Sequence, residues 1–457
     1  MGARPGEIDD ESNFKLHNHI GLSPVESANK IVEHFAKISS EFAPLDVGKL
    51  PKRVTEQMQN ADSTEIPSVY DIDIYEKILK ANKPKSGVPG DLPRRIVSEF
   101  APELSLPVKM IFKSILDSCK QGPVKWPDNW KKEVGVPLQK VEDPKNEDDL
   151  RVISLTSFFS KILESFVIDW LMFYIGDQID PKQFGGLKGN SISHYLIELL
   201  NFILHNQDYN EPVAVLLCAI DFSKAFNRID HNKLITKLSD MGTPGWLLNI
   251  VSGFLMERTM VVKVNGTTSR SKLMPGGGPQ GTLLGLFLFL ILINPCCDLE
   301  KNMSIGEQIT ESRRRFRPST FYAKYVDDMS IGESFNIKEM TPSTVIKELA
   351  NIKTYAEDND MVINLTKTKF MLFNPTRLYD FTPDVTISQT KIETVEEMKI
   401  LGVTLSNDLS WRANTKNIVS KGFKRLWSIK RLKANGASLP DLIDERPDEN
   451  HYCGINW

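Results

Sequence analysis

The chain has 457 residues, a formal net charge of −3 at pH 7, and 41% hydrophobic and 25% charged residues. This length can bury a large core and predicts two or three subdomains, while the charge excludes a uniformly basic coat but not a local basic surface. The five cysteines form no CxxC pair, which argues against a disulfide framework or a zinc site. The longest apolar run, residues 283–293, is too short to span a bilayer and predicts a buried helix, so we expect no membrane role.

In the first part of the chain, periodicity predicts helices and one hairpin. We expect residues 1–65 to form a polar linker with one helix, in SPVESANKIVEHFAKI, whose Ser-Pro start is typical of a helix N-terminus. Helical spacing returns in residues 106–119 and 157–175. Between them, KKEVGVPLQKVE and LRVISL predict two paired strands around the polar turn DPKNEDD.

The middle of the chain mixes strands and helices. PVAVLLCAI, residues 212–220, is a continuous apolar run that predicts a buried central strand, and it ends abruptly at Asp221. HNKLITKLSDMG predicts a helix, and MVVKVNGTTSRSKLM predicts a hairpin that turns at Asn265 and Gly266. Because the elements do not alternate as regular βαβ units, the sequence predicts an α+β fold.

The segment FYAKYVDDMSI places Asp327 beside Asp328, between two short strand-like runs. Two carboxylates about 4 Å apart repel by roughly 4 kcal/mol at the effective dielectric of a protein surface. The pair therefore indicates either a solvated hairpin turn or a site for a divalent cation. Asp221 alone could cap a helix. If the hairpin lies beside the strand that ends at Asp221, three carboxylates converge in the oxygen-rich site that Mg²⁺ prefers.

Two further segments could contact nucleotides or nucleic acid. PGGGPQGTLLG contains consecutive glycines that let the backbone approach a ligand, and Gln280 adds a neutral donor and acceptor; the alternative is a plain loop. Residues 411–435 carry basic side chains and no acidic one, with apolar residues interleaved. This pattern indicates either a solvated helix face with an apolar packing side or a surface that contacts phosphates.

AIDFSKAFNRIDH, GGPQGTLLG and KYVDD, in this order, resemble motifs A, B and C of reverse transcriptases. The chain resembles most closely the polymerase of non-LTR (LINE-type) retrotransposons, from about residue 22 to residue 442. Other segments resemble further signatures of that family: KSGVPGDLP, WKKEVGVPLQK, DLRVISLTSFFSKILE, QFGGLKGNS, NLTKTKFMLF and KILGVTL. The resemblance implies an RNA-directed DNA polymerase that adds dNTPs to a DNA primer 3′-hydroxyl on an RNA template. It also implies phosphoryl transfer assisted by two metal ions.

The resemblance also implies a right-hand polymerase architecture. Fingers are expected in residues 66–200, a palm with an antiparallel sheet in residues 201–405, and a partial helical thumb with an atypical tail in residues 406–457. Members of this family commonly carry an endonuclease, which we expect to be supplied elsewhere. The implied protein is intracellular, in the nucleus, the cytoplasm or both, and the sequence carries no decisive targeting signal.

The resemblance assigns roles to individual residues. Asp221, Asp327 and Asp328 are implied as catalytic residues that hold two Mg²⁺ ions, with Mn²⁺ as a substitute and the Phe222 carbonyl as a further ligand. The other implied roles are triphosphate binding by Lys140 and Arg151, nucleotide and template contact by Gln280 and Gly281, general acid catalysis by Lys367 or Lys369, the primer grip at Leu401, Gly402 and Val403, and duplex binding by Lys421, Lys424, Arg425, Lys430 and Arg431.

Phe226 follows Asp221 by five positions, where the family places an aromatic ring against C2′ of the nucleotide. Such a ring would exclude a 2′-hydroxyl, although Phe226 could instead be a core aromatic on a helix. The implied activity has two alternatives: a catalytically inactive or domesticated nucleic-acid-binding remnant, and an RNA-dependent RNA polymerase. Phe226 and Val326 disfavour the second alternative, because RNA polymerases usually place a polar group and a glycine at these positions.

Overall fold

The computed structural model describes residues 16–61, 66–81, 88, 90–209, 211–297, 299, 318–338, 342–374, 385–387 and 389–436. The chain divides into two compact units. The first unit contains Met1–Ile179 and Lys224–Asn294, and the second contains Asp180–Ser223 and Pro295–Trp457. This division differs from the expected boundaries at residues 66, 201 and 406, because residues 180–223 contribute a strand to a sheet whose other strands follow residue 318.

The N-terminal segment contains two α-helices, α1 (Pro24–Ser39) and α2 (Lys52–Gln59), where we expected one. Ser23 caps α1: its hydroxyl accepts the backbone N–H of Glu26, and the Glu26 carboxylate accepts the N–H of Ser23, so the predicted start of this helix is confirmed. α2 was missed because its sequence is mostly polar. Its buried side chains, Val54 and Met58, are only one helical turn apart.

The sheet of the first unit has the order β2-β1-β5-β6, with β7 also paired to β5. β1 (Lys132–Gln139) and β2 (Leu150–Leu155) are antiparallel, which confirms the first predicted hairpin. β5 (Thr259–Val264) turns at Asn265 and Gly266 into β6 (Thr267–Thr268), and β7 is Lys272–Leu273. Both turn residues have positive φ, 45° and 77°, so the second predicted hairpin is also confirmed.

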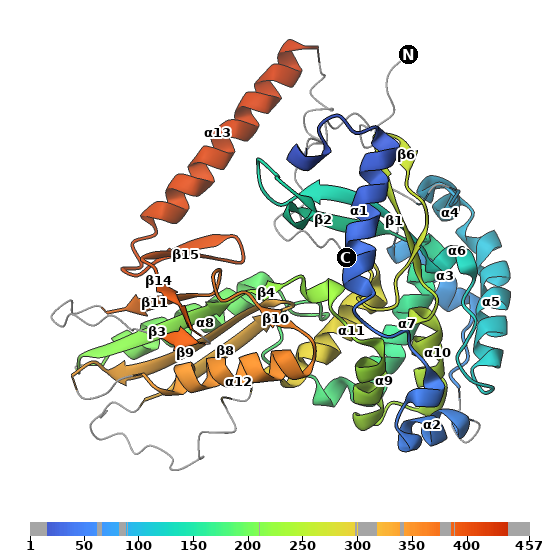
Figure 1. The fold of residues 1–457 in the computed structure, drawn as a ribbon, viewed down its shortest axis with the longest axis horizontal. Helices are drawn as coiled ribbons and strands as arrows, with labels where there is room; N and C mark the ends of the chain where they lie inside the picture. Colours follow the sequence, from blue (N-terminus) through green and yellow to red (C-terminus); the bar gives the residue numbers. More distant parts are fainter. Residues whose placement is uncertain are drawn as a thin grey trace. The chain divides into compact units, whose positions relative to one another are not determined.

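Helices pack against this sheet and against one another (Figure 1). α11 (Leu283–Ile293) is buried over almost its whole length, as its apolar sequence predicted. Within the described residues, no helix is long and apolar enough to cross a membrane. The other α-helices of this unit are α3 (Asp71–Lys80), α4 (Arg94–Glu99), α5 (Ala101–Ser118), α6 (Asp128–Lys131), α7 (Phe158–Ile175), α9 (His231–Asp240) and α10 (Gly245–Leu255).

The second unit is built on a five-stranded sheet with the order β14-β11-β3-β9-β8. β3 (Val213–Ile220) is central and almost fully buried, as predicted. Its neighbours β9 (Asp328–Asn336) and β11 (Lys369–Phe373) are both antiparallel to it. β8 (Thr320–Tyr325) forms the sheet edge on one side and β14 (Glu393–Thr394) the edge on the other.

Two helices flank this sheet in Figure 1. α8 (Ile192–Gln207) packs on β3 and β8 through Tyr195 and other buried side chains, and α12 (Thr344–Asp358) lies against β9. The remaining helix, α13 (Arg412–Ala434), follows the β15–β16 hairpin. The short strands are β4 (Phe222–Ser223), β10 (Val362–Ile363), β12 (Thr386–Ile387), β13 (Thr390–Lys391), β15 (Glu397–Ile400) and β16 (Val403–Ser406).

Single turns of 3₁₀-helix complete the described elements. They occur mainly at the ends of helices and in the loops that lead into strands. They are η1 (His17–His19), η2 (Val47–Lys49), η4 (Glu147–Asp149), η5 (Gly176–Gln178), η6 (Ala225–Asn227) and η7 (Asn294–Cys296).

Candidate active site

The paired aspartates and Asp221 lie next to the same end of one antiparallel ladder. β3 and β9 pair from Val213 with Asn336 to Ile220 with Met329. The ladder ends there, and its last two residues adjoin Asp221 on one strand and Asp328 on the other. Directly opposed residues of an antiparallel pair have Cα atoms about 4.5–5.5 Å apart. The sheet therefore brings together the two sequence segments whose convergence we expected.

Hydrogen bonds fix the backbone of Asp221. Its N–H donates to the Thr368 hydroxyl at 3.3 Å, and its carbonyl oxygen accepts the N–H of Asn364 at 2.7 Å. Phe222, which follows, has a buried side chain and pairs with Ile363 in the short β4–β10 ladder. The loop before β11 thus holds the end of β3 in place, so Asp221 is not a helix cap.

Asp327 lies in the two-residue turn between β8 and β9, where Tyr325 pairs with Asp328. Asp327 is half-buried and Asp328 is exposed. Beneath the turn, the buried Tyr195 hydroxyl donates to Ser330 at 2.6 Å. Burial raises the pKa of Tyr195, and the negative charge of Asp328 raises it further, so this hydroxyl remains a neutral donor.

The donor types at this edge suit Mg²⁺, which prefers carboxylate and carbonyl oxygens. Asp221, Asp327, Asp328 and the Phe222 carbonyl would be its ligands. Within the described residues, however, no three or more His, Cys, Asp or Glu side chains form a group that could hold a metal ion. The backbone register fits the expected site, and the convergence of all three carboxylates stays a prediction.

In the first unit, Lys140 and Arg151 lie on the β1–β2 hairpin, and both side chains are exposed. Lys140 directly follows β1, and its Nζ donates to the carbonyl oxygen of Asp148 at 3.0 Å. Arg151 is the second residue of β2 and pairs with Leu138. The hairpin therefore presents two cations on adjacent strands, a distribution that suits an anionic ligand.

The glycine-rich loop, residues 275–282, is anchored by backbone hydrogen bonds at Gly278 and Gln280. The Ser154 N–H donates to the Gln280 carbonyl at 2.6 Å, and the Gly278 N–H donates to the Phe226 carbonyl at 2.6 Å. Gly281 has a φ of 115°, and a Cβ on it would lie 2.4 Å from the Ser154 carbonyl oxygen. A glycine is required at this position both by the backbone conformation and by the close approach of β2.

Phe226 lies in η6 and is half-buried. Its ring stacks on Phe289 of α11, with centroids 4.7 Å apart and planes inclined by 30°. Packing in the core, the alternative role for Phe226, therefore accounts for one face of the ring. The half-exposure leaves part of the ring accessible, as the sugar-excluding role requires.

The two lysines considered as general acids lie in different surroundings. Lys369 begins β11, and its Nζ lies 2.6 Å from the Glu393 carboxylate. Lys367 is exposed in the preceding turn. Further along the chain, Leu401 and Gly402 form the turn of the β15–β16 hairpin, with φ values of 46° and 88°, and Val403 begins β16. The expected primer grip is thus a tight hairpin turn.

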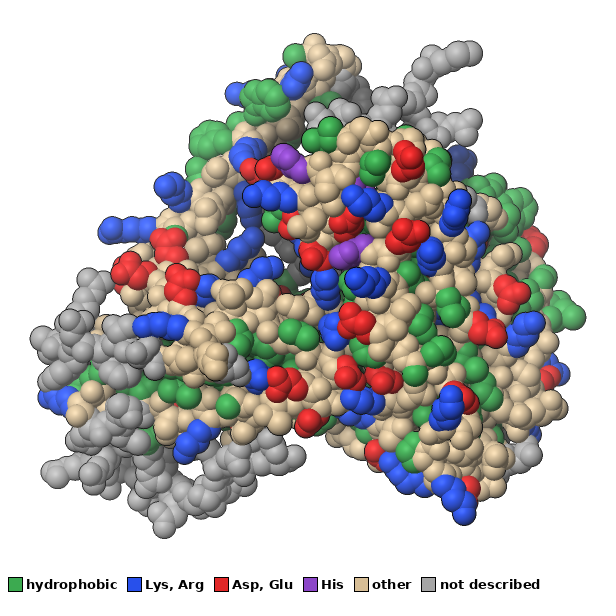
Figure 2. Space-filling model, viewed as in Figure 1, with side chains coloured by type: hydrophobic (Ala, Val, Ile, Leu, Met, Phe, Trp, Pro, Cys, Tyr) green, Lys and Arg blue, Asp and Glu red, His purple; other side chains and the backbone are tan. Residues whose placement is uncertain are grey.

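The five basic residues expected to bind a duplex all lie on α13 and are exposed: Lys421, Lys424, Arg425, Lys430 and Arg431. Figure 2 shows basic and hydrophobic side chains next to each other along this helix. The interleaved apolar residues were expected to pack, but Phe423 and Trp427 are 67% and 61% exposed. The sequence contains a second basic cluster, ESRRRFRPS at residues 311–319, just before the β8–β9 hairpin. All of its arginines lie outside the described residues, so this expectation stays a prediction.

A family model described as "Reverse transcriptase (RNA-dependent DNA polymerase)" matches residues 143–405, more than half of the chain. The chain belongs to this reverse transcriptase family. The match contains the Asp221 and Asp327–Asp328 segments, the glycine-rich loop and the β15–β16 turn. It confirms the family that the sequence motifs indicated.

Curated relatives of this chain are named as polymerases of mobile elements. A "Probable RNA-directed DNA polymerase from transposon BS" of Drosophila melanogaster is 24% identical over 73% of this chain and 35% of its own length. The "RNA-directed DNA polymerase from mobile element jockey" is 25% identical in Drosophila melanogaster, over 86% of this chain and 40% of that protein. Its Drosophila funebris counterpart is 24% identical over 91% of this chain and 43% of that protein. The chain therefore spans about two fifths of the length of these relatives, and the resemblance to non-LTR elements is confirmed.

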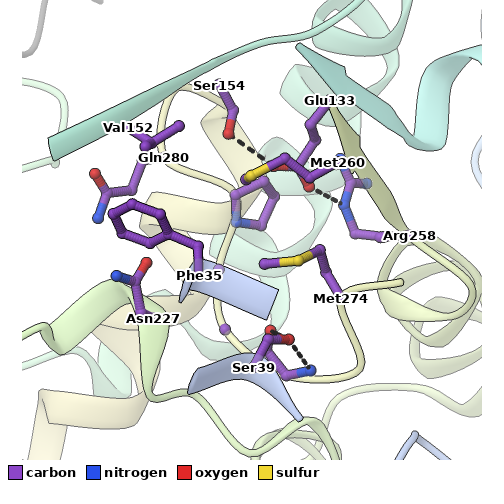
Figure 3. Close-up of a pocket in the computed structure, with 14 residues that line it drawn as sticks. Phe35, Ser39, Glu133, Val152, Ser154, Asn227, Arg258, Met260, Met274 and Gln280 are labelled. Carbon is purple, nitrogen blue, oxygen red and sulfur yellow. Dashed lines mark hydrogen bonds and ion pairs between the residues drawn. The ribbon is translucent and has the colours of Figure 1, made fainter. Parts of the chain in front are cut away.

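Sequence reasoning missed a buried ion pair behind the glycine-rich loop. Figure 3 shows Glu133 between Arg258 and Ser154. The Arg258 Nε donates to Glu133 Oε1 at 2.8 Å, the Ser154 hydroxyl donates to Oε2 at 2.7 Å, and both charged residues are almost fully buried. The available signal was one acidic residue inside an apolar strand, because buried carboxylates need partners.

A buried histidine supports the same loop. The ring Nε2 of His231 donates to the Gly277 carbonyl at 2.7 Å, and burial lowers the pKa of His231 to about 4. Its neutral ring thus supplies a fixed donor at neutral pH. His231 begins α9, and its position in the sequence carries no sign of this role.

Proposed function

We propose that this chain is the polymerase of a non-LTR retrotransposon, an RNA-directed DNA polymerase that adds dNTPs to a primer 3′-hydroxyl on an RNA template. The observation that carries the proposal is the β3–β9 ladder, whose last pair, Ile220 with Met329, directly adjoins Asp221 on one strand and Asp328 on the other. The relatives that share most of this chain are named RNA-directed DNA polymerases, which supports the same reaction.

Two Mg²⁺ ions, or Mn²⁺ in their place, would be held by Asp221, Asp327, Asp328 and the Phe222 carbonyl. When bound, such a pair of ions activates the attacking hydroxyl and neutralises the charge that develops on the leaving pyrophosphate. The chain contributes the fixed backbone positions of the three aspartates. Thr368 and Asn364 hold Asp221, and the β8–β9 turn presents the other two carboxylates.

The incoming dNTP would be bound by groups of the first unit. Lys140 and Arg151 neutralise its triphosphate, and the fork of the Arg151 guanidinium matches phosphate oxygens. Gln280 and Gly281 form the loop against which the nucleotide and template lie. The exposed part of the Phe226 ring excludes a 2′-hydroxyl, so deoxynucleotides are preferred.

Other residues would serve the primer and the leaving group. Lys367 is the better candidate for protonating pyrophosphate, because Lys369 is engaged with Glu393 at 2.6 Å. The turn at Leu401, Gly402 and Val403 holds the primer end. α13 tracks the backbone of the duplex with Lys421, Lys424, Arg425, Lys430 and Arg431, and such contacts make binding strongly salt-dependent.

These roles correspond to a right-hand polymerase. The β1–β2 hairpin and the helices near it form the fingers, the sheet that contains β3, β8 and β9 forms the palm, and α13 forms a partial thumb. RNA template, DNA primer and dNTPs are the partners of this arrangement.

Primer extension on an RNA template with dNTPs and Mg²⁺ tests the proposal, comparing the wild-type chain with Asp327→Ala. We expect extension by the wild type and a loss of at least about a thousandfold in the variant, because the charge in the transition state loses its main stabilisation. Asp117→Ala is the matched control, since it removes an exposed aspartate of α5 that has no assigned role. Extension by neither protein would favour a non-catalytic remnant, and equal extension by both would refute the catalytic role of Asp327.

A further inference from the structure

Residues 182–184 extend the sheet edge next to the candidate catalytic turn. The Lys324 N–H donates to the Lys182 carbonyl at 2.9 Å, and the Phe184 N–H donates to the Lys324 carbonyl at 2.8 Å. Asp180 anchors this segment: its carboxylate lies 2.6 Å from the fully buried Nζ of Lys324. These contacts, all within the second unit, bring Gln183 alongside β8, just before the turn that carries Asp327.

The side chain of Gln183 binds this turn directly. Its Oε1 accepts the N–H of Val326 at 3.0 Å and also the N–H of Gly185 at 3.0 Å. Because two donors converge on the same atom, that atom must be the amide oxygen. The Gln183 side chain is almost fully buried, and its Nε2 has no hydrogen-bond partner among the described residues. The amide oxygen of Gln183, and not its nitrogen, therefore makes the hydrogen bonds of this side chain.

Val326 needs such a partner because its backbone is strained. Its φ is 60°, a left-handed conformation that is rare for a β-branched residue and that favours glycine. Gly185 packs against it so closely that a Cβ on Gly185 would lie 2.7 Å from the Val326 nitrogen. The segment from Gln183 to Gly185 thus both bonds and confines the residue that precedes Asp327.

We propose that Gln183 is a positioning residue for the catalytic aspartates. By holding Val326 in the left-handed conformation, it sets the backbone of Asp327 and Asp328 so that their carboxylates bind the divalent ions. This inference rests on the proposed function for its kinetic consequences, but the binding of metal by the turn can be measured without any polymerase activity.

The first test measures Mn²⁺ binding by electron paramagnetic resonance of the free ion, without nucleic acid or dNTP. Gln183→Met keeps the length of the side chain but removes the acceptor, leaving the Val326 and Gly185 N–H groups without it. We expect the affinity of the Asp327-dependent site to fall about tenfold, the equivalent of the one buried hydrogen bond that holds Val326. Wild-type affinity in Gln183→Met would overturn the proposal.

The matched control is Asn206→Ala. Asn206 is another buried amide of the second unit, and its Oδ1 accepts the hydroxyl of Ser319, just before the far end of the same hairpin. Both variants are expected to lower the melting temperature. Only Gln183→Met should weaken Mn²⁺ binding, and equal weakening in Asn206→Ala would mean that general loss of stability, not positioning, is the cause.

The second test is rescue by Val326→Gly, since glycine adopts a φ of 60° without strain. In the Val326→Gly background, we expect Gln183→Met to change Mn²⁺ affinity less than about threefold, well below the tenfold effect expected for one lost bond. This comparison also keeps the test valid if Gln183→Met alone does not fold. An undiminished effect in that background would overturn the proposal.

Primer extension then separates the two hypotheses. In an active enzyme, Gln183→Met should lower kcat about tenfold, raise the Mg²⁺ concentration for half-maximal rate, and leave the dNTP KM nearly unchanged. A wild-type chain that binds Mn²⁺ in a Gln183-dependent way but extends no primer would refute the proposed function and leave the positioning role intact.

Discussion

Ser154 donates its backbone N–H to the carbonyl oxygen of Gln280 at 2.6 Å, tying the end of β2 to the glycine-rich loop. The same strand carries Arg151, and the hydroxyl of Ser154 also reaches the buried Glu133. A single residue thus links the expected triphosphate contact, the loop expected to contact the nucleotide and the ion pair behind it. Changes to any of these groups should affect the geometry of the loop.

Gly281→Ala should destabilise the protein by about 1–3 kcal/mol, because alanine is strained at a positive φ and its Cβ would collide with the Ser154 carbonyl. The dNTP KM should rise as the loop shifts. Urea unfolding and steady-state primer extension measure the two effects. Gly48→Ala is the control, since its Cβ would meet nothing closer than 3.4 Å. Equal stability of the two variants would contradict the tight contact.

Arg258→Met should destabilise the first unit by about 3–5 kcal/mol, since it leaves the Glu133 carboxylate buried without its partner. The double variant Glu133→Gln, Arg258→Met should lose less than the sum of the single changes, as a double-mutant cycle by urea unfolding would measure. Lys52→Met is the control, because it removes an exposed ion pair with Glu56 at 3.5 Å. An additive cycle would show that the buried charges are independent.

Phe226→Ala should raise incorporation of ribonucleotides relative to deoxynucleotides by roughly 10-fold to 200-fold, the range for loss of one steric contact in a binding pocket. It should also cost about 1–3 kcal/mol of stability, because the ring stacks on Phe289. The ratio of kcat/KM values for the two nucleotide types measures the first effect. Phe226→Tyr keeps the ring and should keep the discrimination. A loss of stability with an unchanged ratio would leave Phe226 a packing residue alone.

His231 should make stability fall as the pH is lowered from 7 to 5. Burial lowers the pKa of His231 to about 4 from an ordinary value of 6.5, so in this range the unfolded state binds more protons than the folded state. The expected loss is about 2 kcal/mol. His231→Gln keeps an N–H donor for Gly277 and should flatten this dependence, whereas His205→Gln, an exposed histidine, should not. Urea unfolding at both pH values measures it, and parallel profiles for wild type and His231→Gln would refute the prediction.

Local sequence determined the elements that carry the candidate site. A continuous apolar run predicted the buried strand β3, Asn265 and Gly266 predicted a hairpin, and FYAKYVDDMSI predicted the β8–β9 turn, because strand periodicity and turn conformations depend on neighbouring residues. The order of motifs around Asp221, Gln280 and Asp327 was sufficient to indicate the family. The short polar helix α2 was missed because it has only two buried side chains, too few to give a helical pattern in the sequence.

Tertiary structure alone decided which distant groups meet. No local pattern could reveal that Gln183 accepts the N–H of Val326, that Arg258 pairs with Glu133, or that Ser154 holds Gln280. Each contact joins segments remote along the chain, and it depends on sheet register and on the need of buried polar groups for partners. The amino-acid sequence by itself determined the chemistry available to this protein, whereas the fold decided how that chemistry is held, because positions are set by long-range packing.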